Sequence, residues 1–247
     1  NISMSDNFEK LNKFKTEVYI DGADLDIVGK YAKKNYIKGF TSNPSLMAAS
    51  GVSDYESFIK KFLNLSESKP VSFEVTVDDS SKMIEQAEKI SSFDESIFVK
   101  IPIVNSKGES SLNTIKYLAE KKIKLNITAL MTAEQSISVI NKINKCSDII
   151  LSIFCGRIAD TGKDPIRTMK EVNEKIKSSG KTSFKSLWAS TREIFNLYQA
   201  DACGTHIITV PFKILKKISL MDKNLEDYST ETARDFVKDA EKAKLKI

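Results

Sequence analysis

The sequence predicts an α/β protein that folds as a single (β/α)8 TIM barrel with an additional C-terminal helix. Eight short runs rich in apolar and β-branched residues follow one another along the chain, and segments with helical periodicity separate them. Strands that alternate with helices pair in parallel through crossover connections. Eight such units within 247 residues fit the size of a barrel of this kind, and no Gly/Ser-rich linker divides the chain.

The expected strands cover residues 18–23, 37–42, 71–77, 97–103, 124–130, 149–154, 184–189 and 207–211. Between them, apolar residues recur on one face, as in amphipathic helices. Such faces are formed by Ile27, Val28 and Tyr31, by Leu112, Ile115, Leu118 and Ala119, and by Ile137, Ile140 and Ile143. We expect one domain over residues 1–247. Residues 1–16 form an N-terminal extension, and the extra helix, residues 229–246, packs on the barrel or on a neighbouring subunit.

The composition is that of an ordinary globular protein. Hydrophobic residues make up 41% of the chain, which supports a sizeable core, yet no apolar run is long enough to cross a membrane. The first residues lack the apolar segment of a secretion signal. The three cysteines, Cys146, Cys155 and Cys203, are odd in number and lack the spacing of metal ligands. We therefore expect a reduced, cytoplasmic protein without membrane association.

The net charge of +5 does not indicate a nucleic-acid partner, because lysines alternate with acidic residues along the chain. This pattern, seen over residues 82–89 and 235–246, is typical of solvated helix faces and not of a basic stripe with aromatic platforms. Arginine is rare, so each of the four is a candidate for a planar, bidentate contact. The four are Arg157, Arg167, Arg192 and Arg234.

Lys100 is the most informative single residue. It interrupts the apolar run of residues 97–103, which is typical of a buried strand in a parallel sheet. Burial of an unpaired ammonium group is costly and favours loss of the proton. An uncharged lysine amine is the group that forms imines with carbonyl compounds. Alternatively, Lys100 lies at the end of the strand and extends to water. The segment alone leaves both interpretations open.

Polar residues gather at the predicted C-terminal ends of the strands, where a barrel of this kind carries its active site. From the first strand to the eighth they are Asp21, Thr41 and Asn43, Glu74, Lys100, Asn126 and Thr128, Ser152 and Arg157, Ser190 and Arg192, and Thr209, to which no role is assigned. Each also has a simpler interpretation as a helix cap, a turn residue or a surface charge. Asp24 is the better cap for the first helix, which leaves Asp21 free. Their occurrence at one level of successive strands favours a shared site.

Several segments occur between Tyr19 and Arg192 in the order of a known family. They are Tyr19-Ile20-Asp21, Gly39-Phe40-Thr41-Ser42-Asn43-Pro44-Ser45-Leu46, Val99-Lys100-Ile101-Pro102, Lys124-Leu125-Asn126-Ile127-Thr128-Ala129-Leu130, Ser152-Ile153-Phe154-Cys155-Gly156-Arg157-Ile158 and Trp188-Ala189-Ser190-Thr191-Arg192. Together they resemble the transaldolases and their smaller relatives, the fructose-6-phosphate aldolases. The departures are Ser42 for the second Thr of the family's TTNPS segment, Ile153 for a Pro, Cys155 for a Val and Thr191 for a Phe. None of them removes a candidate catalytic group.

The resemblance implies a class I aldolase mechanism. Lys100 would attack the C2 carbonyl of a ketose phosphate and form a protonated imine, the electron sink for breaking the C3–C4 bond. Asp21 would take the proton of the C4 hydroxyl during cleavage and return it during condensation. Glu74 and Thr128 would position a water that shuttles protons while the carbinolamine forms and collapses. The resemblance implies no metal and no other cofactor, because the imine replaces the Lewis acid.

The resemblance also implies how a phosphorylated sugar would be bound. Hydroxyl groups of the three-carbon unit would be bound by Asn43 and Asn126, and the site would be lined by Thr41 and Ser152. Arg157 and Arg192, together with Ser190, would hold the terminal phosphate, which suits the geometry of a guanidinium group.

Two positions distinguish the activities within the family. The position of Glu74 carries Glu in transaldolases and Gln in the aldolases, and Phe154 stands where the aldolases have a Tyr that helps protonate the released carbanion. Both residues are of the transferase type. We therefore expect a transaldolase that passes a dihydroxyacetone unit from sedoheptulose 7-phosphate or fructose 6-phosphate to an aldose phosphate. The alternatives are an aldolase-type lyase and a sugar-phosphate binding protein without catalysis. Family members include dimers and larger rings, so a homo-oligomer is expected.

Overall fold

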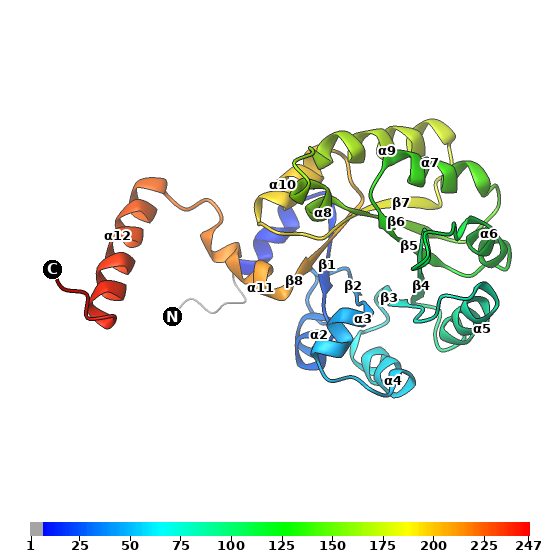
Figure 1. Cartoon of the computed structure of the whole chain (residues 1–247), viewed down its shortest axis with the longest axis horizontal. Coiled ribbons are helices and arrows are strands. Elements are labelled where there is room, and N and C mark those ends of the chain that lie inside the picture. Colours follow the sequence, from blue (N-terminus) through cyan, green and yellow to red (C-terminus); the bar gives the residue numbers. More distant parts are fainter. Residues whose placement is uncertain (1–6) are drawn as a thin grey trace.

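The computed structural model describes residues 7–247 and contains a closed barrel of eight parallel strands (Figure 1). The strands are β1 (Glu17–Asp21), β2 (Gly39–Thr41), β3 (Val71–Glu74), β4 (Ile97–Pro102), β5 (Leu125–Leu130), β6 (Ile149–Phe154), β7 (Phe184–Ala189) and β8 (Ile207–Pro211). Each strand pairs with the next, and β8 pairs with β1, which closes the barrel. The predicted fold class is confirmed.

The bounds of the strands differ from the predicted ones mainly at β2 and β3. The strand β2 begins at Gly39 instead of residue 37, and β3 ends at Glu74 instead of residue 77. At the end of β3 the N–H group of Thr76 donates to Gln86 Oε1 at 2.6 Å, so this part of the chain bonds to a helix side chain in place of a neighbouring strand. The last three strands have the predicted bounds.

Helices connect the strands around the outside of the barrel (Figure 1). They are α2 (Leu25–Tyr31), α3 (Pro44–Ala49), α4 (Tyr55–Leu65), α5 (Ser80–Ser91), α6 (Leu112–Glu120), α7 (Ala133–Lys142), α8 (Cys155–Asp160), α9 (Pro165–Ser179), α10 (Phe195–Ala202) and α11 (Phe212–Leu215). Asp24 caps α2 as predicted, because its side chain accepts hydrogen bonds from the N–H groups of Asp26 and Ile27. Thr132 and Gln135 form a reciprocal capping box at the start of α7.

The side chains of the barrel form two separate hydrophobic clusters, because successive residues of a strand point to opposite sides of the wall. The larger cluster lies between the strands and the helices. The smaller one contains Tyr19, Phe98, Ile150, Leu187, Ala189 and Ile207, with Phe154 packed against it. Two residues after four of these positions the same side of the strand becomes polar, at Asp21, Lys100, Ser152 and Thr209. An apolar layer in the barrel interior thus supports a polar layer at the C-terminal end.

The predicted N-terminal extension lies partly outside the described residues, since residues 1–6 are not among them. The rest contains a 3-10 helix, η1 (Glu9–Lys13). Phe8 and Leu11 are buried, and the Phe8 ring stacks on Phe212 with 6.3 Å between the ring centroids. This segment is therefore tied to α11 by aromatic packing.

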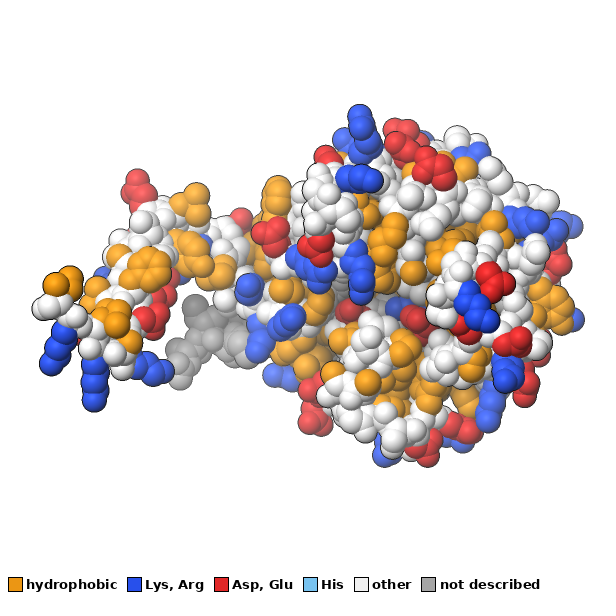
Figure 2. Space-filling view, viewed as in Figure 1, with side chains coloured by type: hydrophobic (Ala, Val, Ile, Leu, Met, Phe, Trp, Pro, Cys, Tyr) orange, Lys and Arg blue, Asp and Glu red, His pale blue; other side chains and the backbone are white. Residues whose placement is uncertain are grey.

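The predicted C-terminal helix is present as α12 (Leu225–Lys242), after the 3-10 helix η2 (Lys216–Leu220). It begins four residues before the predicted start at residue 229, because the side chain of Asn224 caps it by accepting from the N–H group of Asp227. Figure 1 shows α12 standing away from the barrel. None of its residues is buried, and Leu225, Phe236 and Val237 are exposed by 79%, 69% and 59%. Figure 2 shows hydrophobic side chains along this helix.

Two of the sequence-based expectations concern the chain as a whole. Among residues 7–247, no helix combines the length and the apolar character needed to span a membrane. The organisation of residues 1–247 as one domain stays a prediction.

Candidate active site

A cavity of about 160 Å³ lies at the C-terminal end of the barrel strands. Most of the residues that the sequence analysis selected line it: Asp21, Thr41, Asn43, Lys100, Ser152, Phe154, Arg157, Ser190 and Arg192, together with Ala189 and Thr209. The other selected residues, Glu74, Asn126 and Thr128, are not part of its wall and lie on β3 and β5. The structure thus gathers the selected residues at one end of the barrel.

Lys100 is buried within β4, with 6% of its surface exposed. Its Nζ donates to the main-chain oxygen of Ser42 at 3.0 Å and lies 3.8 Å from Glu74 Oε1. The strand register explains the second contact, since Glu74 of β3 pairs with Lys100 of β4. The amine therefore faces the cavity among bonded neighbours and does not extend to open water.

The charge of Lys100 acts electrostatically on two carboxyl groups from different strands. Burial raises the pKa of Asp21, although the charge of Lys100 and a hydrogen bond from Thr41 oppose this shift. Burial also raises the pKa of Glu74, again against the effect of Lys100. A raised pKa brings a carboxyl group closer to the neutral range, in which an acid–base catalyst works best. Both groups are thus suited to moving protons beside an amine.

Asn126 of β5 lies next to Lys100 in the register of the two strands. It is fully buried, and its side chain accepts from Ser152 Oγ at 2.6 Å and donates to Ser72 Oγ at 3.0 Å. This network joins β3, β5 and β6 across the interior of the barrel. It holds the side chain of Ser152, which lines the cavity.

Thr128 lies in an irregular part of β5. The pairing of β5 with β6 shifts register between Ile127 and Leu130, and Ala129 between them has a φ of 61°, in the left-handed region. Bulges of this kind redirect side chains and are common next to active sites. The Thr128 hydroxyl is buried and has no hydrogen-bond partner in the part of the chain from residue 7 onward. Its hydrogen-bonding capacity is thus unused within these residues.

Arg157 in α8 and Arg192 after β7 line the same cavity. Their segments approach closely at Gly156, where an added Cβ would lie 1.8 Å from the main-chain oxygen of Ser190. Only glycine allows this approach. Ser190 has a φ of 58°, which turns the chain sharply at the end of β7. The Arg192 guanidinium is 3.0 Å from Asp160 Oδ2 in an exposed ion pair, whose stabilising effect is small.

Asn43 has a structural role in addition to its place on the cavity wall. Its Oδ1 accepts from the N–H group of Leu46 at 2.9 Å and so caps α3. The interpretation of Asn43 as a helix cap is therefore confirmed. Its amide nitrogen is the part of the side chain that is left to face a substrate.

The sequence analysis missed three contributors to the site. The main-chain oxygen of Ser42 holds Lys100, and no pattern of side chains indicates such a contact. Thr209 lines the cavity and was left without a role. Its spacing of two from buried Ile207 is the signal that places it on the inner side of the barrel. Gly156, directly before Arg157, was quoted only as part of a motif.

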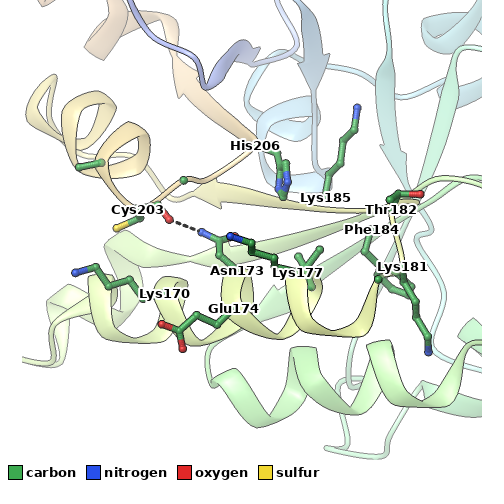
Figure 3. Close-up of a pocket in the computed structure, with 14 residues that line it drawn as sticks. Lys170, Asn173, Glu174, Lys177, Lys181, Thr182, Phe184, Lys185, Cys203 and His206 are labelled. Carbon is green, nitrogen blue, oxygen red and sulfur yellow. Dashed lines mark hydrogen bonds between the residues drawn. The ribbon is translucent and has the colours of Figure 1, made fainter.

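A larger cavity of about 770 Å³ lies at the opposite end of the barrel, where β7 and β8 begin (Figure 3). It contains none of the selected residues, and several of its polar groups hold the fold together. Lys181 bonds the last carbonyl groups of α7, and Asn173 donates to the main-chain oxygen of Cys203 at 2.9 Å. His206 Nδ1 accepts from the N–H group of Ser186 at 3.0 Å. We therefore assign the candidate active site to the smaller cavity.

No group of three or more His, Cys, Asp and Glu side chains lies close enough to hold a metal ion among residues 7–247. The polar groups around the smaller cavity are instead one lysine, two carboxyl groups, two arginines, hydroxyl groups and amides. This set of groups can form an imine, move protons and bind an anion.

The fold and the site define a (β/α)8-barrel protein with a buried lysine at the C-terminal end of the barrel. The chain belongs to the family of transaldolase and fructose-6-phosphate aldolase, whose sequence model matches residues 18–247. A probable transaldolase of Syntrophobacter fumaroxidans is 30% identical over 226 residues, which cover 91% of this chain and 96% of the relative. A probable transaldolase of Brevibacillus brevis is 28% identical over 217 residues, covering 87% and 96%.

Solved structures of low sequence identity share the fold. An HpcH/Hpal aldolase/citrate lyase family protein from Burkholderia cenocepacia matches with a TM-score of 0.56 at 7% identity, over 94% of this chain and 99% of that one. Orotidine 5'-monophosphate decarboxylase from Methanocaldococcus jannaschii matches with a TM-score of 0.50 at 15% identity, over 80% and 88%. At these identities the matches show the barrel fold alone.

Proposed function

We propose that the protein is a transaldolase. It would transfer a dihydroxyacetone unit from sedoheptulose 7-phosphate or fructose 6-phosphate to an aldose phosphate, through an imine at Lys100. The observation that carries the proposal is the buried Lys100 amine, 3.8 Å from Glu74 and on the wall of a cavity that also contains Asp21. Family membership supports the same reaction class.

Imine formation is the first step. The uncharged Lys100 amine attacks C2 of the ketose, the carbonyl oxygen takes a proton, and the resulting carbinolamine loses water to give a protonated imine. Glu74 and Thr128 are proposed to hold the water that carries these protons. The raised pKa of Glu74 and the buried, unpartnered Thr128 hydroxyl support this role.

Cleavage of the C3–C4 bond follows. Its electron pair moves into the imine to give an enamine, and the C4 hydroxyl gives its proton to Asp21 as the aldehyde leaves. Asp21 must be ionised to accept this proton. Condensation with the acceptor aldehyde runs the same steps in reverse, with Asp21 as the acid.

Substrate binding is proposed to use the remaining residues of the cavity. Asn43 and Asn126 bind hydroxyl groups of the three-carbon unit, and Thr41 and Ser152 line the space around it. Arg157, Arg192 and Ser190 hold the phosphate at the mouth of the cavity. The exposed positions of both arginines on that wall support a contact with a charged end of the substrate.

Transfer, and not release, of the three-carbon unit is proposed from two residues. Glu74 and Phe154 are both of the transferase type within the family. The Phe154 ring is half-buried on the cavity wall and has no proton to donate to the enamine, so the bound unit persists until an aldehyde arrives. An aldolase-type lyase would need such a donor.

Borohydride trapping tests the proposal. The protein is incubated with fructose 6-phosphate, reduced, and analysed by intact mass and peptide mapping. We expect a stable three-carbon adduct on Lys100 and none in Lys100→Ala. Lys124→Ala, at the start of the next strand, is the matched control and keeps the adduct. Active protein without an adduct would overturn the imine mechanism, and folded, inactive protein without one would favour a binding protein.

The acceptor dependence separates the two enzyme activities. We expect fast formation of sedoheptulose 7-phosphate when erythrose 4-phosphate is added with fructose 6-phosphate, and slow release of dihydroxyacetone without an acceptor. Rapid cleavage without an acceptor and no transfer would identify a lyase instead.

The proposal also covers assembly and location. We propose a homo-oligomer in which α12 packs on another copy of the chain, supported by the exposed Leu225, Phe236 and Val237 on a helix without a buried residue. We propose a cytoplasmic location. The three cysteines support it, since all are free thiols.

A further inference from the structure

Thr209, which the sequence analysis left without a role, lies in a chain of hydroxyl groups that ends at Asp21. Its Oγ1 is 2.6 Å from Thr41 Oγ1, and the Thr41 hydroxyl donates to Asp21 Oδ1 at 2.8 Å. Both threonines are buried, with 4% and 2% of their surface exposed. The three residues come from β8, β2 and β1, and β1 lies between the other two strands in the barrel.

The direction of these hydrogen bonds follows from counting protons. A hydroxyl group has one proton to donate, and an ionised carboxylate can only accept. When Asp21 is ionised, the proton of Thr41 is therefore used on Asp21. The contact of 2.6 Å between the threonines then requires Thr209 as the donor and Thr41 as the acceptor.

We propose that Thr209 is a positioning residue, whose hydroxyl orients Thr41 so that Thr41 donates to Asp21. This role rests on the proposed function of Asp21 as the proton acceptor from the C4 hydroxyl. Hydrogen bonds in a chain polarise one another, so donation from Thr209 strengthens donation from Thr41. The chain thereby favours the ionised form of Asp21, which the cleavage step needs.

The backbone of β8 holds Thr209 in place for this role. Its main-chain oxygen accepts from Thr191 Oγ1 at 2.7 Å, in the segment that follows β7. Thr191 is itself buried. The main chain at Thr209 is thus held by the segment that follows β7.

The charged groups around Asp21 are independent of Thr209. Lys100 faces Asp21 from β4, and Glu74 lies beyond Lys100 on β3. Arg157 from α8 and Arg192 from the segment after β7 line the same cavity. A substitution at Thr209 leaves all four in place, so a change in the titration of Asp21 would report the missing hydroxyl.

The first test compares Thr209→Val, which keeps the shape and loses the hydroxyl, with Thr209→Ser, which keeps the hydroxyl. For Thr209→Val we expect the single-turnover rate of fructose 6-phosphate cleavage to fall about fivefold, the factor that corresponds to one neutral hydrogen bond. The acidic limb of the pH–rate profile should move to higher pH, while borohydride trapping at Lys100 is unchanged. Thr209→Ser should restore both the rate and the profile.

Two kinetic results would overturn the proposal. One is a Thr209→Val variant with the wild-type rate and pH profile. The other is an equal loss in Thr209→Val and Thr209→Ser, because then the hydroxyl is not what matters. If Thr209→Val does not fold, Thr209→Ala is compared with Thr209→Ser in the same way.

The second test does not depend on catalysis and so remains valid if the proposed function fails. The stability lost in Thr209→Val is measured by urea unfolding at several pH values, with and without Asp21→Asn. We expect this loss to grow with pH when Asp21 is present and to be independent of pH when it is replaced. The same pH dependence in both backgrounds would overturn the link from Thr209 to Asp21.

Discussion

Charged side chains inside an apolar barrel are the main feature of the site at the scale of single residues. Lys100 is buried, and Asp21 and Glu74 lie where desolvation disfavours the charge of a carboxylate. Lys100 is stabilised by Glu74 and by the oxygen of Ser42, and Asp21 by Lys100 and Thr41. Removal of the Lys100 charge would therefore raise the pKa of both carboxyl groups further, and single substitutions should separate the chemical steps.

Asp21→Asn should leave imine formation intact and slow cleavage of the carbon–carbon bond. An amide cannot accept the proton of the C4 hydroxyl, and loss of an acid–base group costs about 10²-fold or more in rate. Single-turnover cleavage of fructose 6-phosphate and borohydride trapping measure the two steps. Asp24→Asn is the matched control, since Asn also caps a helix well and Asp24 is exposed. Normal turnover of Asp21→Asn would remove Asp21 from the mechanism.

The stability of the protein should also depend on pH through Asp21. Its pKa is raised in the folded state, so between the unfolded value, about 3.9, and the folded value the folded protein binds more protons than the unfolded chain. Stability therefore falls as the pH rises through this window, by about 1.4 kcal/mol per pH unit for one group. Asp21→Asn lacks this effect. Its free energy of unfolding, relative to that of the wild type, should therefore increase as the pH rises. Parallel curves from urea unfolding would contradict this.

At the scale of elements, the junction of β6 with α8 determines whether Arg157 and Arg192 lie at the same cavity. Gly156 lets the first turn of α8 touch the main chain at Ser190. Arg157 directly follows Gly156, and Arg192 lies two residues after Ser190. The short helix α8 thus places a guanidinium group at the same cavity as the end of β7.

Gly156→Ala should separate these segments. The added Cβ meets main-chain oxygen, which cannot move aside as a flexible side chain could, so we expect a loss of about 1–3 kcal/mol in stability. The KM for fructose 6-phosphate should rise more than kcat falls. Gly29→Ala in α2 is the control, because its Cβ meets only the end of the Leu65 side chain, at 3.3 Å. A wild-type KM in Gly156→Ala would show that the spacing of the arginines is unimportant.

The elements that follow local rules could be predicted from the sequence. The strands β6, β7 and β8 are short, mainly apolar runs, and their bounds match the prediction. The bulge in β5 could not be predicted, because Ala129 carries no sequence signal for a left-handed φ. The same holds for Ser190. Neither residue is a glycine or asparagine, the types that local rules associate with a left-handed φ.

For the whole molecule, the free surface of α12 is the feature that most needs explanation. A helix with 18 residues and no buried side chain has little tertiary stabilisation of its own. Packing of its apolar face on a second copy of the chain would supply the stabilising contacts that the barrel does not make with α12.

Phe236→Glu should therefore dissociate the proposed oligomer. A carboxylate in the centre of an apolar contact is desolvated without a partner. Light scattering coupled to size-exclusion chromatography should give a larger mass for the wild type than for the variant. Lys238→Glu, also exposed on α12, is the control and should keep the wild-type mass. A monomeric wild type would refute this mode of assembly.

The overall architecture was predictable because a repeated alternation of strand and helix permits few arrangements. The strand pattern also indicated the positions of Lys100, Asp21 and the arginines, and the family resemblance added the roles expected of them. Neither source indicates main-chain contacts or pairs of hydroxyl groups from distant strands, such as Thr41 with Thr209, since these depend on the register around the closed barrel.

The contact between Lys100 and Ser42 has a consequence for sequence change over time. The acceptor is a peptide carbonyl, and every amino acid brings the same carbonyl to position 42. Substitution of Ser42 therefore keeps the hydrogen-bond acceptor of the Lys100 amine, provided that the main chain keeps its path. Because the Ser42 side chain is itself buried, a mutational scan should find small residues tolerated at position 42 and no replacement tolerated at Lys100.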